Sequence, residues 1–165
     1  MAAFTVSGPF QIPVSQLGSG KLITGAGNFW NKARSHLDGI GCYVFAIQAG
    51  KGYTPWYVGK TKTTFNNECF TAHKLLKYNQ AILSVKKGTP VLFFISHPKQ
   101  KGPINHKQIR EIEVFFTQVA LLKNGSLLNI KNTKQQTWSI QGIVRGTQGN
   151  VSKSTADLRK ALGLK

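Results

Sequence analysis

The apolar residues of the chain gather into short runs that are typical of β-strands. Residues 41–48 (GCYVFAIQ) are rich in β-branched and aromatic side chains and predict a first strand. A turn rich in glycine and proline follows at 49–55, and residues 56–59 (WYVG) predict a second short strand. The two strands therefore predict a hairpin. A third run, 91–96 (VLFFIS), has the length of a buried central strand.

Two longer segments change to a helical period. In residues 65–85, Phe65, Cys69, His73 and Gln80 recur at helical spacing, which predicts one continuous helix. Its candidate N-caps are Thr63, Thr64 and Asn66. Residues 105–123 give the clearest helix. Its apolar side chains fall at three- and four-residue steps, at Ile109, Ile112, Phe116 and Val119.

The outer segments carry weaker patterns. Residues 1–38 are rich in glycine and serine and predict short strands or an extended arm, with a helical turn at 28–37. Residues 137–145 alternate and predict a late strand, and 154–162 predict a short helix with Ser154 as its N-cap. The order of elements predicts an α+β fold with a small central sheet, a hairpin plus a further strand, flanked by helices. We expect one compact domain made of an extension (1–38), a core (39–132) and a second extension (133–165).

The charge changes this picture most. Among 165 residues, 22 are Lys or Arg and five are Asp or Glu, which gives a formal net charge of +17. Such a field attracts polyanions, and nucleic acid is the partner that it favours. No apolar run is long enough to span a membrane, and the first residues do not form a secretory signal. Two cysteines are too few for a disulfide framework. We therefore expect a cytoplasmic protein without a membrane partner or a small-molecule cofactor.

Two triplets at the predicted hairpin carry a candidate chemistry. They are Gly41-Cys42-Tyr43 and Tyr57-Val58-Gly59, with 13 residues between the tyrosines. After them come Lys60, a helix with His73, a strand, a helix with Glu113, and then Asn129. This order of motifs and elements resembles the GIY-YIG nuclease family over about residues 39–132.

The resemblance implies a metal-dependent endonuclease that hydrolyses phosphodiester bonds, with DNA favoured as the substrate. It implies catalytic roles for Tyr43, Tyr57, His73 and Lys60, and a divalent cation, Mg²⁺ or in its place Mn²⁺, at Glu113. The implied supporting residues are Gly41, Gly59, Lys74 and Asn129. The lysines expected to bind nucleic acid are Lys60, Lys62, Lys74 and Lys77.

Two carboxylates compete for the metal role on the second helix. Mg²⁺ needs few protein ligands, so one carboxylate with waters and substrate oxygens is sufficient. Glu111 and Glu113 are two residues apart, about 200° around the helix. The apolar residues of this helix place Glu113 beside the packed face and Glu111 in solvent. We therefore favour Glu113.

The proton transfers suggest roles for hydroxyl and imidazole groups. We expect Tyr43 and Tyr57 to face one cavity, where each hydroxyl could position the attacking water. A phenol with its ordinary pKa near 10 is a demanding base, and His73 could share that duty because imidazole titrates nearest neutrality. A satisfied, half-buried histidine is the alternative for His73. For Asn129 the alternative is an Asx-turn after the helix.

One position departs from the family pattern. The family carries an arginine one helical turn before the histidine, and Cys69 stands there in this chain. Lys60 is the first candidate to replace that cation and Lys74 the second. The departure also keeps a second function open, a catalytically weakened or silent nucleic-acid-binding module on the same fold. A basic, ribosome-associated structural protein is a third, which explains the charge but not the order of motifs.

Overall fold

The computed structural model describes residues 3–18, 20–98, 103–133, 140 and 152–163. The chain separates into two units, residues 1–133 and 134–165. The single compact domain expected from the sequence stays a prediction. Helix α5 (Lys153–Ala161) belongs to the second unit and contains no buried residue among those described. Each unit is therefore described by itself.

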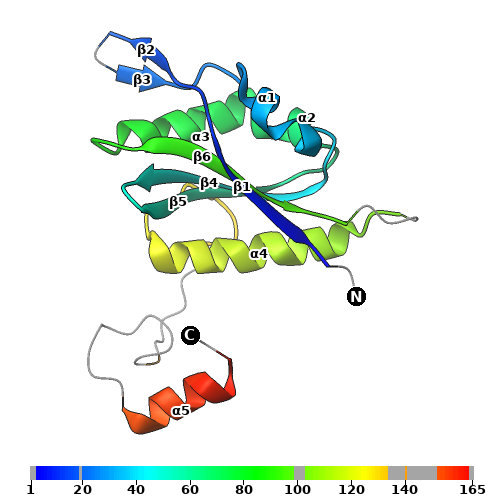
Figure 1. The fold of residues 1–165 in the computed structure, drawn as a ribbon, viewed down its shortest axis with the longest axis vertical. Coiled ribbons are helices and arrows are strands. Elements are labelled where there is room, and N and C mark those ends of the chain that lie inside the picture. Colours follow the sequence, from blue (N-terminus) through cyan, green and yellow to red (C-terminus); the bar gives the residue numbers. More distant parts are fainter. Residues whose placement is uncertain (1–2, 19, 99–102, 134–139, 141–151, 164–165) are drawn as a thin grey trace. The chain divides into compact units, whose positions relative to one another are not determined.

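The first unit is built on an antiparallel sheet of four strands in the order β1-β6-β4-β5 (Figure 1). These strands are β1 (Thr5–Gln11), β4 (Gly41–Ala49), β5 (Gly52–Lys60) and β6 (Thr89–Ser96). A separate two-stranded hairpin is formed by β2 (Ser15–Leu17) and β3 (Gly20–Leu22). With the helices that flank the sheet, the predicted α+β class is confirmed. Residues 1–38, expected as an extension, instead supply the edge strand β1.

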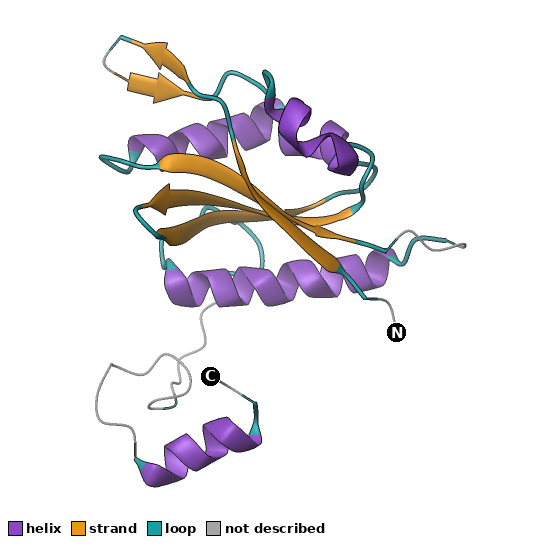
Figure 2. Ribbon diagram, in the orientation of Figure 1, coloured by secondary structure: helices purple, strands orange, loops and turns teal. Residues whose placement is uncertain are grey.

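Helices cover both faces of the sheet (Figure 2). One face carries α1 (Phe29–Ala33), a short 3₁₀ turn (Arg34–His36), α2 (Phe65–Cys69) and α3 (Ala72–Leu83). The other face carries α4 (His106–Lys123). In the described part of the chain, no helix has both the length and the apolar character that crossing a bilayer requires.

The two faces of the sheet have separate cores. On the α1–α3 side, aromatic rings dominate, and Phe45 stacks on Tyr78 with centroids 4.2 Å apart. On the α4 side, smaller residues pack, among them Cys42, Val58 and Ile109, all fully buried. Alternate residues of β4 and β5 therefore serve opposite cores, as the period of a strand requires.

The helix predicted over residues 65–85 is broken. The structure has α2 up to Cys69 and α3 from Ala72, and Thr71 between them is extended, with φ −64° and ψ 155°. The three apolar residues before the break point into the core, where Phe65 and Cys69 are fully buried and Phe70 packs against Phe29. Packing thus overrides the helical period. Cys69 and His73 consequently lie on different helices. Cys69 is therefore not one helical turn before His73, which corrects the spacing that the sequence predicted for the missing arginine.

The hairpin is longer than predicted, because β5 begins at Gly52 rather than at residue 56. Pro55 lies inside this strand, which is tolerated because β5 is an edge strand. Tyr57 pairs with Phe45 and Pro55 pairs with Ala46, so Trp56 is the extra residue of a bulge.

The second unit tests few of the expectations for the C-terminal segment. Helix α5 begins one residue earlier than predicted, and its N-cap is Ser152 rather than Ser154. The Ser152 hydroxyl accepts a hydrogen bond from the Thr155 backbone N–H at 3.2 Å. The strand predicted over 137–145 lies outside the described residues, apart from Ile140.

Candidate active site

A cavity of about 470 Å³ opens at the edge of the sheet formed by β5, between α3 and α4. Its lining residues come from four parts of the first unit: Tyr57 and Lys60 of β5, His73 and Lys77 of α3, Arg110 and Glu113 of α4, and Asn129, Ile130, Lys131 and Asn132 of the segment that follows α4. Six of these ten residues were predicted from the sequence as site residues. The fold thus brings together side chains separated by up to 75 positions of the chain, from Tyr57 to Asn132.

Tyr57 and Lys60 of strand β5 lie on opposite faces of the sheet. Tyr57 belongs to the core under α3, whereas its neighbour Val58 belongs to the core under α4. Lys60, two residues beyond Val58, lies on the α4 side and forms an ion pair with Glu113. The edge strand therefore reaches the cavity from both faces of the sheet.

Tyr57 is held by lysines of α3. The Lys74 ammonium donates a hydrogen bond to the Tyr57 hydroxyl at 2.6 Å and lies 4.8 Å from the centre of the ring. Burial, together with the Glu113 carboxylate and against the opposing effect of Lys60, raises the pKa of Tyr57 to about 12. Burial also lowers the pKa of Lys74 below its ordinary value. Tyr57 is therefore a neutral phenol near pH 7, able to donate its own proton in a hydrogen bond.

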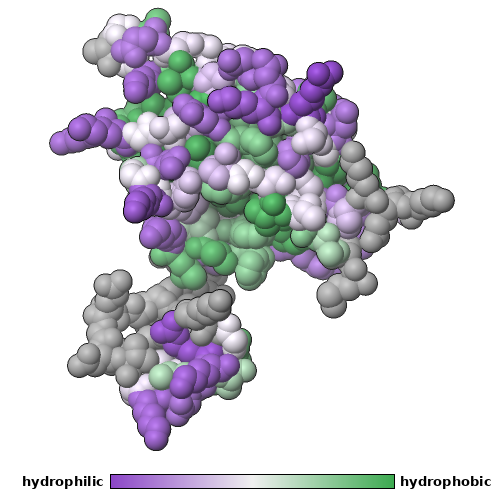
Figure 3. Space-filling model, viewed as in Figure 1, coloured by the Kyte–Doolittle hydropathy of each residue, from purple (hydrophilic) through white to green (hydrophobic). Residues whose placement is uncertain are grey.

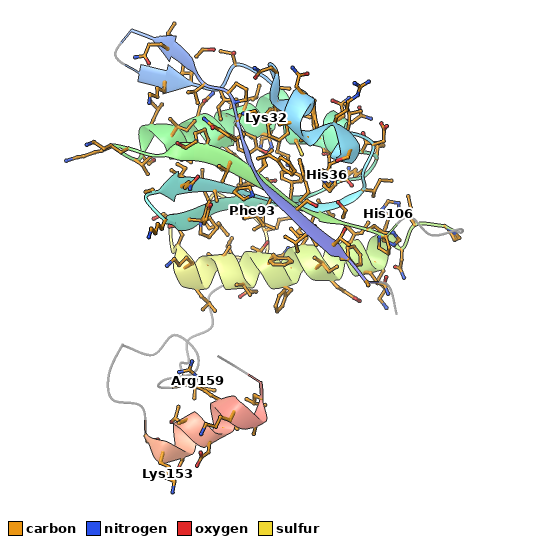
Figure 4. All side chains as sticks on the ribbon, viewed as in Figure 1. Lys32, His36, Phe93, His106, Lys153 and Arg159 are labelled. Atoms are coloured by element: carbon orange, nitrogen blue, oxygen red, sulfur yellow. The ribbon has the colours of Figure 1, made fainter. Side chains whose placement is uncertain are left out.

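Helix α4 places its carboxylates as its register predicted. The helix begins at His106, labelled in Figure 4, and the Asn105 side chain caps it by accepting from the Gln108 backbone N–H. Glu113 is 15% exposed and lines the cavity, whereas Glu111 is exposed and does not. Glu113 is the carboxylate of this cavity. Nowhere in the described ranges do three or more His, Cys, Asp or Glu residues cluster as a ready metal site.

The solvent side of α4 is apolar. Phe115, Val119 and Leu122 are exposed, and hydrophobic side chains gather over this helix in the space-filling view (Figure 3). These exposed apolar residues do not line the cavity. The residues of α4 that do line it, Arg110 and Glu113, are both charged.

Asn129 ties the segment after α4 to the edge strand. Its amide oxygen accepts from the Val58 backbone N–H at 2.9 Å, and its amide nitrogen donates to the Val58 carbonyl at 2.8 Å. The neighbouring Leu128 backbone N–H donates to the Trp56 carbonyl at 2.8 Å, and Lys77 donates to the Leu128 carbonyl at 2.6 Å. Asn129 therefore completes the backbone hydrogen bonding of β5, and the Asx-turn alternative does not describe it.

Tyr43 does not share the cavity with Tyr57, contrary to the expectation. Its side chain is fully buried, with its ring 6.2 Å from that of Tyr57 and in edge contact with Phe65. A Cβ on Gly59 would lie 2.3 Å from the Tyr43 ring, so the glycine is needed to seat this tyrosine. Burial raises the pKa of Tyr43 well above its ordinary value. Tyr43 therefore packs beside Tyr57 in the core and does not line the cavity.

The remaining predicted residues lie in different surroundings. His73 lines the cavity and is exposed, unlike the half-buried histidine of the alternative. Lys62 is exposed, and Lys74 lies behind Tyr57; neither is among the lining residues. Gly41 has φ +156°, and a Cβ there would lie 2.1 Å from the Ile95 carbonyl oxygen, so its role is steric.

Sequence reasoning missed four lining residues, Arg110, Ile130, Lys131 and Asn132. Arg110 carried a usable signal, because it lies three residues before Glu113 and hence on the same side of the helix. The others follow Asn129, whose contact with β5 only the fold reveals. With them, four Lys and Arg side chains and one carboxylate line the cavity, which makes it an anion-attracting site.

No protein-family profile, no curated protein and no solved structure matches the chain. The resemblance drawn from the motifs therefore rests on these residues and on their arrangement.

Proposed function

We propose that the protein is a metal-dependent endonuclease that hydrolyses phosphodiester bonds in DNA through a site of the GIY-YIG kind. The observation that carries this proposal is the convergence on one cavity of Tyr57, Lys60, His73, Glu113 and Asn129. The order of motifs along the sequence singles out the same five residues. The antiparallel hairpin with helices on both sides is compatible with the same proposal.

The charge of the cavity suits a phosphate ester. Lys60, Lys77, Arg110 and Lys131 face one carboxylate, within a chain whose formal charge is +17. Binding of a polyanion to such a surface releases condensed counterions, which gives affinity without sequence selection. Lys62, exposed beyond the end of β5, extends the basic surface outside the cavity.

Glu113 fits the role of a ligand to Mg²⁺ or Mn²⁺. Its carboxylate is accessible from the cavity, and Mg²⁺ accepts a single carboxylate when waters and phosphate oxygens fill its other positions. A divalent ion at this carboxylate would neutralise charge that develops on the phosphate oxygens. Asn129 is not a further ligand, since its amide is engaged with Val58. Lys60 must release Glu113 for the ion to bind, and its ammonium is then available to a phosphate.

Tyr57 and His73 divide the handling of the attacking water. Lys74 donates to the Tyr57 oxygen, so the phenol proton remains free to point into the cavity. With a pKa near 12, Tyr57 orients a water or a phosphate oxygen and does not act as a base. His73 is the histidine that lines the cavity, and we assign the acceptance of the proton to it because imidazole is the side chain most often used as a general base.

A second function is favoured by one feature, the ion pair between Lys60 and Glu113. This pair occupies the carboxylate that a metal would need. A protein in which the pair never opens would bind nucleic acid through its basic surface without cleaving it. The two functions differ in whether the chain cleaves DNA, and not in whether it binds.

The test is incubation of the protein with supercoiled plasmid and Mg²⁺ or Mn²⁺, with and without EDTA. We expect nicked and linear products that require the metal. Glu113→Gln keeps the shape of the side chain but removes its charge, so cleavage should fall by about 100-fold or more. Glu111→Gln, the matched control on the exposed side of α4, should cleave as the wild type does.

A binding measurement distinguishes a silent nucleic-acid-binding module from a protein that has neither function. Affinity for a fluorescent duplex, measured in EDTA, should fall steeply with salt, by about 0.9 log–log units for each phosphate contacted. Salt-dependent binding with no cleavage by the wild type would establish the silent module instead. Affinity that is indifferent to salt would remove both functions.

A further inference from the structure

Arg110 is an unengaged cation in the cavity. It lies in α4, is exposed, and lines the cavity with Glu113, three residues further along the helix. The structure gives its side chain no hydrogen bond or ion pair to any described residue. Three lysines at or beside the cavity are engaged: Lys60 with Glu113, Lys74 with the Tyr57 hydroxyl and Lys77 with the Leu128 carbonyl.

The chemistry of the guanidinium adds to this position. Its planar fork can donate two parallel hydrogen bonds to two oxygens of one phosphate, and it stays charged at every working pH. An ammonium provides a point charge without that geometry. A free guanidinium beside the cavity carboxylate is therefore placed to bind the same phosphate that an ion held at Glu113 would contact.

We infer that Arg110 binds the non-bridging oxygens of the phosphate whose bond is cleaved. The inference rests on the proposed function and supplies the arginine that the motif pattern lacks, from a different helix. It also revises the substitution expected from the sequence, because Lys74 is engaged with Tyr57 and Lys60 reaches a phosphate only after it has released Glu113. Lys131 is the competing residue, since it lines the cavity and its side chain makes no hydrogen bond or ion pair with the described residues.

The experiment compares Arg110→Ala, Arg110→Lys and Lys131→Ala with Arg34→Ala, an exposed arginine outside the cavity. Single-turnover nicking of supercoiled plasmid gives the rate, and duplex binding in EDTA gives the affinity. We expect Arg110→Ala to slow nicking by about 100-fold, the scale of losing one positioned donor at a developing anion. Arg110→Lys should be intermediate, Arg34→Ala should match the wild type, and affinity should fall by less than about tenfold.

Two results would overturn the inference while the enzyme remains active. One is a rate for Arg110→Ala within about threefold of the wild-type rate. The other is a large loss in Lys131→Ala with none in Arg110→Ala, which would assign the phosphate to Lys131. Thermal unfolding of each variant excludes misfolding as the cause, and Arg110→Lys, which keeps the charge and most of the length, provides a second folded variant.

An inactive wild type would refute the proposed hydrolysis, and the binding data would then decide on Arg110 alone. Loss of one phosphate contact should reduce the slope of log affinity against log salt by about 0.9 in Arg110→Ala, but not in Arg34→Ala. That result would retain Arg110 as a phosphate ligand of a silent module. An unchanged slope would overturn this contact as well.

Discussion

Replacement of Asn129 by alanine tests whether the fold of the site depends on one side chain. The Asn129 amide makes two hydrogen bonds to Val58, at 2.9 Å to its N–H and 2.8 Å to its carbonyl. Val58 is fully buried, so water has poor access to these backbone groups. Alanine removes both partners and leaves a donor and an acceptor of β5 unsatisfied.

The magnitude follows from these two bonds. A buried polar group without a partner costs about 1–3 kcal/mol, so two give about 2–6 kcal/mol. Part of this cost returns if water enters beside the shortened side chain, which makes about 2–4 kcal/mol our expected loss in the free energy of unfolding. The variant should also lose cavity geometry, because Asn129 holds to β5 the segment that carries Ile130, Lys131 and Asn132, whose other described contact is the hydrogen bond from the Gln118 side chain to the Asn132 carbonyl. A displacement of about 1 Å there can slow catalysis on the order of 100-fold.

Urea unfolding followed by circular dichroism measures the first effect, and plasmid nicking at a temperature where the variant is folded measures the second. Asn31→Ala is the matched control, because Asn31 is an exposed asparagine of α1 and should change stability by about 0.5 kcal/mol at most. A loss in Asn129→Ala no larger than in Asn31→Ala would refute the assignment of Asn129 as the residue that holds this segment to β5.

Two further predictions concern buried groups. Cys69→Arg should destabilise the protein by on the order of 3–5 kcal/mol, because Cys69 is fully buried and a guanidinium there has no partner; thermal unfolding against Asn67→Arg, on the exposed side of α2, checks this, and a stable, more active Cys69→Arg would contradict the broken helix. The free energy of unfolding should also fall as the pH rises above about 9, because burial raises the pKa of Cys42 from 9.0 and that of Tyr57 from 10.0, each to about 12. The folded chain then keeps protons that the unfolded chain releases, at up to about 1.4 kcal/mol per pH unit and group; equal urea midpoints at about pH 7 and pH 10.5 would refute it.

The parts of the fold that the sequence predicted are those with strong local patterns. The strand at 91–96 and the helix at 105–123 have uninterrupted apolar periods, and both lie close to their predicted bounds. The segment 65–85 has an equally regular period but forms two helices, because Phe70 and its neighbours are buried together at the break. A helical period does not show whether the backbone stays helical across it, and some of the periodic positions, Val119 and His73 among them, are exposed.

A site residue could be predicted where its position within one helix decides whether its side chain is exposed. Helical register distinguishes Glu113 from Glu111, and the structure places the two side chains as that register requires. The accessibility of Tyr43 could not be read in this way. Strand alternation puts Tyr43 and Tyr57 on the same face, but the burial of one of them depends on Gly59 and Phe65, which pack against it from two other elements.

The candidates for a replacement cation show that the position of a residue in the chain is a poor guide to its position in the site. Cys69, which stands at the motif position, is the buried last residue of α2. Lys60 and Lys74, the lysines expected to replace the arginine, contact Glu113 and Tyr57. A phosphate in the cavity can be bound by any side chain that is positively charged and that reaches its oxygens, whichever helix carries the residue. Arg110 satisfies both conditions from the opposite side of the sheet. Substitution of the motif arginine therefore does not require loss of function, provided that another element delivers a free guanidinium to the same oxygens.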